Sequence, residues 1–273
     1  MADTLPIEFD LDDPQPDDDN ITDWCLERFR SHYGDASIGK DDIWEYLYGV
    51  MHAPDWRERY RHDLQRNLPR VPLAGDFEAF RAAGRALMDL HIGYETVPEW
   101  PGTCLVDGRP DEGDADPDAY RIDGRMRWGR ATAAGDDRAV AEGAGSRTSR
   151  RPAGAGGRAE DRSVLEINGR CRLVGIPAEA HEYTVSGRSP LAWAIDSLRH
   201  KHDKASGITD DPNGWHVWAD EPFNLIRHLR RLVTVATETA NIVRSLPPSL
   251  PAPNAQPGLP NGGEGPSPAS RRA

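Results

Sequence analysis

The sequence predicts an α+β fold with a helical N-terminal part, a small antiparallel sheet, a long C-terminal helix and disordered tails. Three observations predict it. Apolar residues recur at helical spacing between residues 21 and 100. Two apolar runs flank Asn168-Gly169, which is a strong signal for a β-hairpin. A further apolar stripe from about residue 222 to residue 244 indicates the long final helix.

The ends of the chain differ in composition from its middle. Residues 1–20 contain eight acids and no base, so they carry −8 of the formal net charge of −12 in the 273-residue chain. Such a charged segment buries little, and we expect a disordered acidic arm. Residues 247–273 contain eight prolines and predict a second disordered tail. The domain itself is therefore expected over residues 21–246, helical over 21–100 and mixed α+β over 101–246.

Capping signals divide the helical part into segments. A first helix is expected over roughly 23–33 and should end at Gly34, which tolerates a left-handed backbone. Asp41 is the expected N-cap of the second helix. Pro54 fits the first turn of a third helix that would extend through Leu64.

A fourth helix should begin after Asp76, another candidate N-cap, with apolar residues along one stripe. Aromatic and aliphatic residues at helical spacing are typical of a packed core. The expected core residues here are Trp44, Tyr48, Val50, Leu64, Phe77 and Phe80.

The second half of the chain opens with turn-rich residues and then changes character. Residues 129–162 contain seven glycines, nine alanines and seven arginines, and Val140 is their only branched aliphatic residue. They predict a low-complexity insertion without a core of its own. The strands 164–167 and 171–174 follow. Their connecting loop is either Asn168-Gly169 alone or a longer loop that includes Arg170, so two registers remain open.

Beyond this hairpin we expect a third strand over 182–185 and then a helix that starts at Ser189-Pro190, with serine as N-cap. Residues 205–215 carry loop signals. Pro247-Pro248 should end the long final helix.

Several classes of function lack their sequence signals. The only lysines are Lys40, Lys201 and Lys204, and none lies in a phosphate-binding Gly-Lys-Ser/Thr context. His200 and His202 form the only close histidine pair, without a cysteine nearby, so no zinc site is expected. We therefore expect no catalytic residues, no metal and no cofactor. Three widely spaced cysteines and the absence of a long apolar run favour a cytoplasmic protein without a membrane span.

The middle of the chain is basic although the whole chain is acidic. Residues 120–204 hold sixteen basic and eleven acidic residues, for a local charge of +5. Fourteen of these bases are arginines, which suit bidentate contacts with phosphates and guanine edges. Asn168 and Arg170 at a hairpin tip could enter a major groove, and the helix start beside Arg188 could hold a phosphate. Alternatively, these arginines are ordinary surface charges.

Short sequence blocks across 20–120 and 163–246 resemble those of a known family and occur in the same order along the chain. The longest is YGVMHAPDWRERY at 48–60, within a block that starts at Ile43. The others are NITD at 20–23, YGD at 33–35, LPRVP at 68–72, Gly84, LH at 90–91, YE at 94–95, GIP at 175–177, Glu179-Ala180, YTVSGRS at 183–189, LAW at 191–193, DKASGI at 203–208, DPNGW at 211–215, VTV at 233–235 and ET at 238–239. Together they resemble the C-terminal specificity domain of type ISP restriction–modification enzymes.

The resemblance implies target recognition on duplex DNA for a methyltransferase and a nuclease. Met1 lies just before the matching region, so we expect the nuclease, translocase and methyltransferase parts on a partner chain. The insertion 129–162 stands where the family continues with strand-like sequence. The candidate DNA-binding residues are Asn168, Arg170, Arg172, Arg188, Ser189, Lys201, Lys204 and Ser206.

The expected function is thus a DNA-recognition module without catalysis of its own, which binds DNA weakly because the chain is acidic overall. Two alternatives remain open. The chain could be a protein-interaction subunit that docks on a catalytic restriction–modification partner, or a non-functional gene remnant. An acidic mimic of DNA is a poorer fit, since the acids cluster in one short segment.

Overall fold

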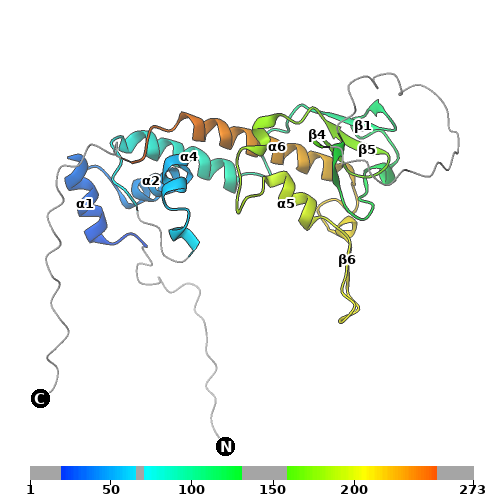
Figure 1. The fold of residues 1–273 in the computed structure, drawn as a ribbon, viewed down its shortest axis with the longest axis horizontal. Coiled ribbons are helices and arrows are strands. Elements are labelled where there is room, and N and C mark those ends of the chain that lie inside the picture. The colour runs from blue at the N-terminus through cyan, green and yellow to red at the C-terminus, as the bar shows by residue number, and fades with distance from the viewer. Residues whose placement is uncertain (1–19, 66–70, 131–158, 251–273) are drawn as a thin grey trace, which may run out of the picture. The chain divides into compact units, whose positions relative to one another are not determined.

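The computed structural model describes residues 20–65, 71–130 and 159–250 (Figure 1). Most of the acidic arm, the central part of the low-complexity insertion and the tail from residue 251 lie outside the described residues. The chain divides into two compact units. Unit 1 comprises Met1–Arg85 and Pro247–Ala273, and unit 2 comprises Ala86–Leu246. None of the described helices combines the length and the apolar character that a membrane crossing needs.

The helices of unit 1 begin and end largely at their capping residues. They are α1 Asp23–Tyr33, α2 Lys40–His52, α3 Pro54–Arg59 and the first part of α4 Phe77–Ile92, with a short 3₁₀ turn η1 Asp63–Gln65. Gly34 ends α1 with a φ of 67°, and the Asp76 carboxylate accepts the Ala79 N–H at 2.9 Å, both as predicted. Asp41 as the N-cap was wrong, because α2 begins at Lys40 and Asp41 lies within its first turn.

Gly39 is the N-cap residue of α2, and its N–H donates to the Asp42 carboxylate at 2.8 Å. The third helix is also shorter than predicted, since α3 ends at Arg59. Trp44 and Leu64 are 48% and 42% exposed, so their assignment to the core was wrong.

An aromatic cluster forms the core of unit 1. The rings of Tyr46 and Phe77 stack with centroids 5.1 Å apart, and Phe29 meets the edge of Tyr46 at 5.3 Å. The buried Tyr46 hydroxyl donates to the Pro72 carbonyl and accepts the Ala74 N–H, both at 2.7 Å. These bonds satisfy the only polar group of the ring inside the core.

The beginning of the C-terminal tail belongs to unit 1. Ser249 is buried, and its N–H and hydroxyl each donate to the Asp55 carboxylate at 2.8 Å. The Leu250 N–H donates to the same carboxylate at 3.1 Å. The predicted disordered tail therefore begins too early, because Ser249 and Leu250 are hydrogen-bonded to the start of α3.

Unit 2 contains a five-stranded antiparallel sheet in the order β2-β1-β5-β4-β3. Its strands are β1 Thr103–Val106, β2 Arg109–Pro110, β3 Arg127–Arg130, β4 Glu160–Glu166 and β5 Cys171–Val174. The β4–β5 hairpin confirms the predicted pair of strands. Ile167 N–H donates to the Cys171 carbonyl at 2.9 Å, so the loop is the longer one, which includes Arg170.

The ends of the low-complexity segment are part of this sheet. Gly129 pairs with Asp161, and Arg130 pairs with Glu160, across β3 and β4. The predicted boundaries of the insertion, 129 and 162, were therefore too wide. Cross-strand hydrogen bonds hold these residues although their side chains bury little.

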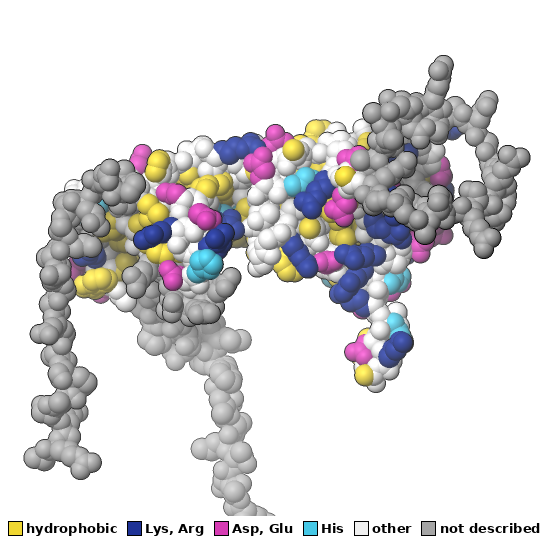
Figure 2. All heavy atoms as spheres, in the orientation of Figure 1, with side chains coloured by type: hydrophobic (Ala, Val, Ile, Leu, Met, Phe, Trp, Pro, Cys, Tyr) yellow, Lys and Arg dark blue, Asp and Glu magenta, His cyan; other side chains and the backbone are white. Residues whose placement is uncertain are grey.

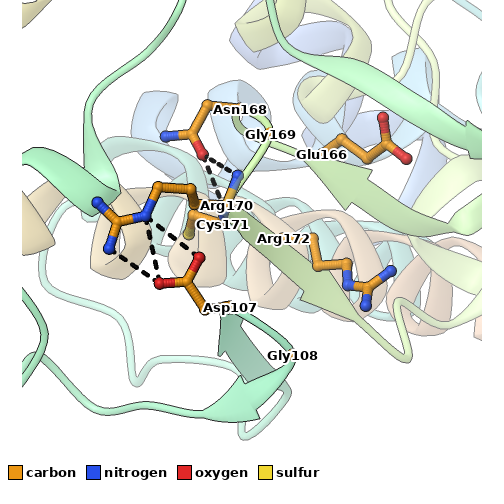
Figure 3. A pocket seen from close by; sticks show the side chains of 8 residues that line it. All are labelled: Asp107, Gly108, Glu166, Asn168, Gly169, Arg170, Cys171 and Arg172. Carbon is orange, nitrogen blue, oxygen red and sulfur yellow. Dashed lines mark hydrogen bonds and ion pairs between the residues drawn. The ribbon is translucent and has the colours of Figure 1, made fainter. Parts of the chain in front are cut away.

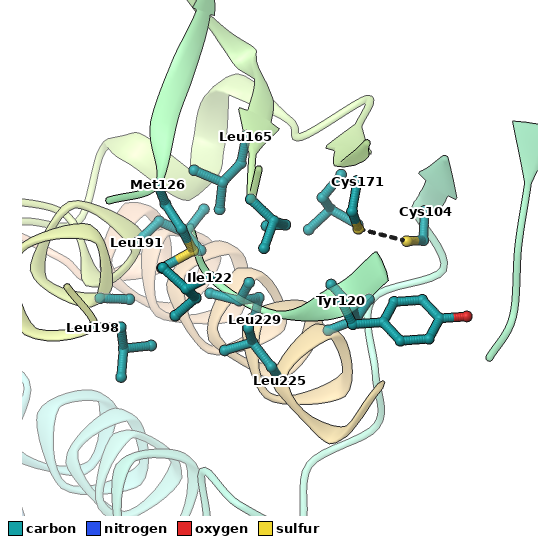
Figure 4. Close-up of a cluster of buried hydrophobic side chains, with 14 of the residues drawn as sticks. Cys104, Tyr120, Ile122, Met126, Leu165, Cys171, Leu191, Leu198, Leu225 and Leu229 are labelled. Atoms are coloured by element: carbon teal, nitrogen blue, oxygen red, sulfur yellow. Dashed lines mark hydrogen bonds between the residues drawn. The ribbon is translucent and has the colours of Figure 1, made fainter. Parts of the chain in front are cut away.

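Two helices pack against the sheet. They are α5 Pro190–Ser197 and α6 Phe223–Ser245, and both confirm predicted helices. Leu225 and Leu229 of α6 lie in the core with Leu165 of β4 (Figure 4). Cys104 and Cys171 are buried free thiols there, with their sulfur atoms 3.6 Å apart.

The predicted strand 182–185 was wrong. The chain forms the 3₁₀ turns η2 Pro117–Tyr120, η3 Ala178–His181 and η4 Pro212–Gly214, and a tight turn follows η3. In this turn Ser186 and Gly187 have φ angles of 52° and 77°, and the flanking Val185 and Arg188 form only an isolated β-bridge. A small hairpin of β6 Lys201–His202 and β7 Thr209–Asp210 lies partly within the region predicted as loop.

Candidate nucleic-acid interface

The turn of the β4–β5 hairpin is held by one side chain. The Asn168 amide donates to the carbonyls of Ala119 and Arg121 at 2.8 and 2.6 Å. Its carbonyl oxygen accepts the N–H groups of Arg170 and Cys171 at 2.7 and 2.8 Å. The hydrogen-bonding groups of Asn168 are thus used within the protein, so this residue shapes the turn and is not placed to read a base.

Arg170, at the end of the same turn, projects its side chain next to the neighbouring β1–β2 turn (Figure 3). Its Nε lies 3.2 Å from both oxygens of Asp107, and its Nη2 lies 2.9 Å from Oδ2. The hydrogen bond from Arg170 lowers the pKa of the Asp107 carboxyl, so the pair is charged at neutral pH. The Arg170 side chain nevertheless remains 48% exposed.

Arg172 is exposed on β5 and pairs in register with Glu166 on β4. Both residues line a hollow of about 260 Å³ together with Asp107, Gly169 and Arg170 (Figure 3). Three of the sequence-predicted residues, Asn168, Arg170 and Arg172, thus lie around one hairpin tip.

Arg188 follows the tight turn at Ser186-Gly187. Its guanidinium lies over the exposed ring of Trp193, 5.1 Å from the ring centroid, and forms an ion pair with Asp196. Asp196 also binds Arg125 at 2.5 Å. A single carboxylate on α5 therefore holds two exposed arginines from different segments of the chain.

The predicted phosphate site at the start of α5 is contradicted by its geometry. Ser189 is 5% exposed, and its hydroxyl accepts the Ala192 N–H at 3.3 Å. Pro190 has no N–H, and Leu191 is buried. The first turn therefore offers no group of exposed N–H donors, and Ser189 acts as the N-cap of the helix.

The β6–β7 hairpin projects from unit 2 and carries the remaining predicted residues (Figure 1). Lys201 and Lys204 are exposed, and neither has a carboxylate partner among the described residues. The Asp203 carboxylate accepts the N–H groups of Ala205 and Ser206, which shapes the tip of the hairpin.

Backbone hydrogen bonds fix the base of this hairpin. His200 N–H donates to the Gly124 carbonyl at 2.9 Å, and Arg199 forms a β-bridge with Arg125. The Asn213 amide exchanges two hydrogen bonds with the backbone of Ile122, at 2.9 and 3.0 Å. Figure 2 shows basic side chains gathered where α5 and the base of the hairpin lie.

Arg125 connects these features. It lines a hollow of about 140 Å³ with Arg127 and the hairpin residues Asn168 and Gly169, and it pairs with Asp196 on the other side. Sequence reasoning missed Arg125, Arg127 and Arg199, and the spacing of arginines between residues 121 and 130 was the available signal.

In the part of the chain that the structure describes, no three His, Cys, Asp or Glu side chains are placed to hold a metal ion.

Comparisons with known proteins relate this chain to restriction–modification enzymes. A family model described as the Type ISP C-terminal specificity domain matches residues 6–227. Among solved structures, the chain is similar to a nuclease-deletion mutant of the Type ISP restriction-modification enzyme LlaGI in complex with a DNA substrate mimic, with 31% identity and a TM-score of 0.55. It is also similar to DrdV in a DNA complex, with 31% identity and a TM-score of 0.59.

The ATP-dependent Type ISP enzyme LlaBIII bound to DNA shares the fold, with 24% identity and a TM-score of 0.58. The matches to LlaGI, DrdV and LlaBIII cover 77%, 84% and 82% of this chain, but only 14%, 20% and 12% of those chains. No curated protein matches the sequence.

Proposed function

This chain belongs to the family of Type ISP C-terminal specificity domains, and from that membership we propose that it recognises a target sequence in duplex DNA without catalysing a reaction itself. Methylation, translocation and cleavage are then the task of other parts of a restriction–modification system. The observation that carries the proposal is the likeness over most of this chain to two proteins solved with DNA or a DNA mimic.

The exposed basic side chains of unit 2 support the proposal. Arg125, Arg170, Arg188 and Lys204 come from separate loops, and loops on a rigid scaffold commonly carry binding residues. We assign Lys201 and Lys204 to phosphate contacts. The lysine ammonium is a compact point charge on a flexible stem, which suits a phosphate better than the hydrogen-bonding edge of a nucleotide base.

The net negative charge of the whole chain opposes binding to DNA. With a net charge of −12, the chain lacks the long-range field that attracts DNA. We therefore expect binding that is weak and falls steeply with salt, and a catalytic partner that adds its own contacts.

The test is a charge reversal on the projecting hairpin. The variant Lys201→Glu/Lys204→Glu should bind a random-sequence duplex more weakly at low salt, measured by fluorescence anisotropy. Removing two phosphate contacts should also reduce the slope of log K against log salt by about 2. The matched control is Arg59→Glu/Arg61→Glu, which makes the same change of charge on exposed residues of unit 1. Equal loss of binding in both variants would show that net charge, and not this hairpin, governs the association.

A second candidate function is supported by unit 1. Trp24 is 70% exposed on α1 and lies beside a hollow of about 540 Å³ with Arg28 and Leu73. An exposed indole next to an arginine is a common anchor in protein interfaces. If the chain is an interaction subunit, Trp24→Ala should weaken capture of the methyltransferase of the same system, while the hairpin charge reversal should leave that capture intact.

A further inference from the structure

We infer that Arg170 reads a guanine in the major groove of the target and that Asp107 is the residue that positions it. This inference rests on the proposed function. It concerns two turns of the sheet, at Asp107-Gly108 between β1 and β2 and at Asn168–Arg170 between β4 and β5.

The ion pair leaves part of the guanidinium available. A guanidinium has five N–H donors. Asp107 occupies the edge formed by Nε and Nη2, while Nη1 has no partner among the described residues. The remaining donors can reach the O6 and N7 acceptors of a guanine. Adenine presents an amino donor in place of O6, so the same donors would discriminate against it by about tenfold or more.

Both residues are held by their backbones as well as by the ion pair. The Asp107 N–H donates to the Arg170 carbonyl at 2.9 Å, which extends the β1–β5 pairing one residue beyond Val106 and Cys171. Asp107 and Gly108 have φ angles of 50° and 81°, as a tight two-residue hairpin turn requires. Asn168 fixes the other turn through its four hydrogen bonds. A guanidinium fixed in this way loses less conformational entropy when it binds.

The surroundings leave room for the edge of a base pair. Gly108 and Gly169 lie at the tips of the two turns and line the hollow next to Arg170 (Figure 3). A hydrogen on each α-carbon in place of a side chain allows close approach of another molecule. The alternative is an ordinary surface ion pair at the end of the β1–β5 pairing, in which case Arg170→Ala leaves the sequence preference unchanged.

The experiment is a selection of the full chain on a pool of random duplex DNA at low salt. The wild-type chain should enrich a sequence that contains a guanine whose preference disappears in Arg170→Ala and weakens in Asp107→Asn. Preferences at the other positions should persist. Arg109→Ala is the matched control, because it removes one exposed charge from the adjacent strand β2 and should leave the sequence preference unchanged.

A second measurement tests the contact itself. Replacing the identified guanine with 7-deazaguanine removes the N7 acceptor and should lower the affinity of the wild-type chain by about tenfold. The affinity of Arg170→Ala should not respond to this replacement. Circular dichroism of each variant establishes that it is folded.

The outcomes distinguish a failure of the guanine contact from a failure of the proposed DNA recognition. Enrichment of no sequence by the folded wild-type chain would overturn the proposed function, and the guanine contact with it. If the wild type selects a sequence but Arg170→Ala selects the same one, the guanine contact is wrong while the proposed function stands. A uniform loss of affinity for all sequences in Arg170→Ala would make Arg170 a phosphate contact instead.

Discussion

The guanidinium of Arg230 on α6 forms two hydrogen bonds with the carboxylate of Glu112, from Nη1 to Oε2 at 2.8 Å and from Nη2 to Oε1 at 2.9 Å. The Arg230 side chain is only 6% exposed, whereas Glu112 lies in the loop between β2 and η2. The pair therefore fixes an irregular loop to the longest helix of unit 2.

Glu112→Gln should destabilise unit 2 by about 1–3 kcal/mol, because it leaves a buried cation without its closest partner. The free energy of unfolding in urea measures the effect. Glu221→Gln, which removes an exposed partner of Arg227, is the control and should cost less than about 0.5 kcal/mol. Similar losses in both variants would mean that Glu99, 3.7 Å from Arg230, compensates for the missing carboxylate.

Gly84 allows α4 to approach α2 closely within unit 1. A Cβ at this position would lie 1.7 Å from the Glu45 carbonyl oxygen, and backbone atoms there cannot move aside easily. Gly84→Ala should therefore destabilise unit 1 by about 1–3 kcal/mol or more. Faster hydrogen exchange of the α2 amides would report the effect.

Gly75→Ala is the control for this substitution, since nothing lies within 4 Å of the position that a Cβ would take there. It should leave the exchange of α2 unchanged. Equal protection of α2 in wild type and Gly84→Ala would show that the two helices can separate without cost.

We expect His181 to make the stability of unit 2 depend on pH. Its Nε2 donates to the Arg162 carbonyl at 3.0 Å, and its buried Nδ1 has no partner among the described groups. Burial lowers the pKa of this imidazole below its ordinary value of 6.5. Below pH 6.5 the unfolded chain therefore binds a proton that the folded chain does not, and stability falls as the pH falls.

The thermal midpoint should accordingly decrease between pH 7 and pH 5.5, and His181→Gln should reduce that decrease by about 2 °C. His216→Gln, at an exposed position, should follow the wild type. Identical pH profiles of all three proteins would exclude His181 as the source of the dependence.

Local signals account for the elements that the sequence predicts correctly. Gly34, Asp76 and Ser189 act at helix ends within a few residues, and the structure confirms all three. The strand 182–185 failed because Glu182 keeps a helical backbone at the end of η3, and the run forms only the single bridge between Val185 and Arg188. The β1–β2 hairpin was missed although Asp107-Gly108 carries a strong turn signal.

The candidate site was predictable only in part, because its ion pairs join distant segments. Arg170 and Arg188 stand out in the sequence, but their carboxylate partners do not. Asp107 is 63 residues from Arg170, and Asp196, although only eight residues from Arg188, is 71 residues from its second partner Arg125. Asn168 was expected to face DNA, whereas the fold supplies two backbone carbonyls from the η2 region that occupy its amide. No periodicity or spacing encodes these contacts.

Asn168→Ala separates the structural role of this residue from base recognition. The substitution removes four hydrogen bonds, which contribute about 1 kcal/mol each at most sites, so unit 2 should lose about 2–4 kcal/mol of stability. Arg170 would then be less well ordered, and affinity for every duplex sequence should fall while the preferred sequence stays the same. Urea unfolding and selection on random duplex DNA measure the two effects. A changed preference at one position with unchanged stability would instead make Asn168 a direct reader of a base.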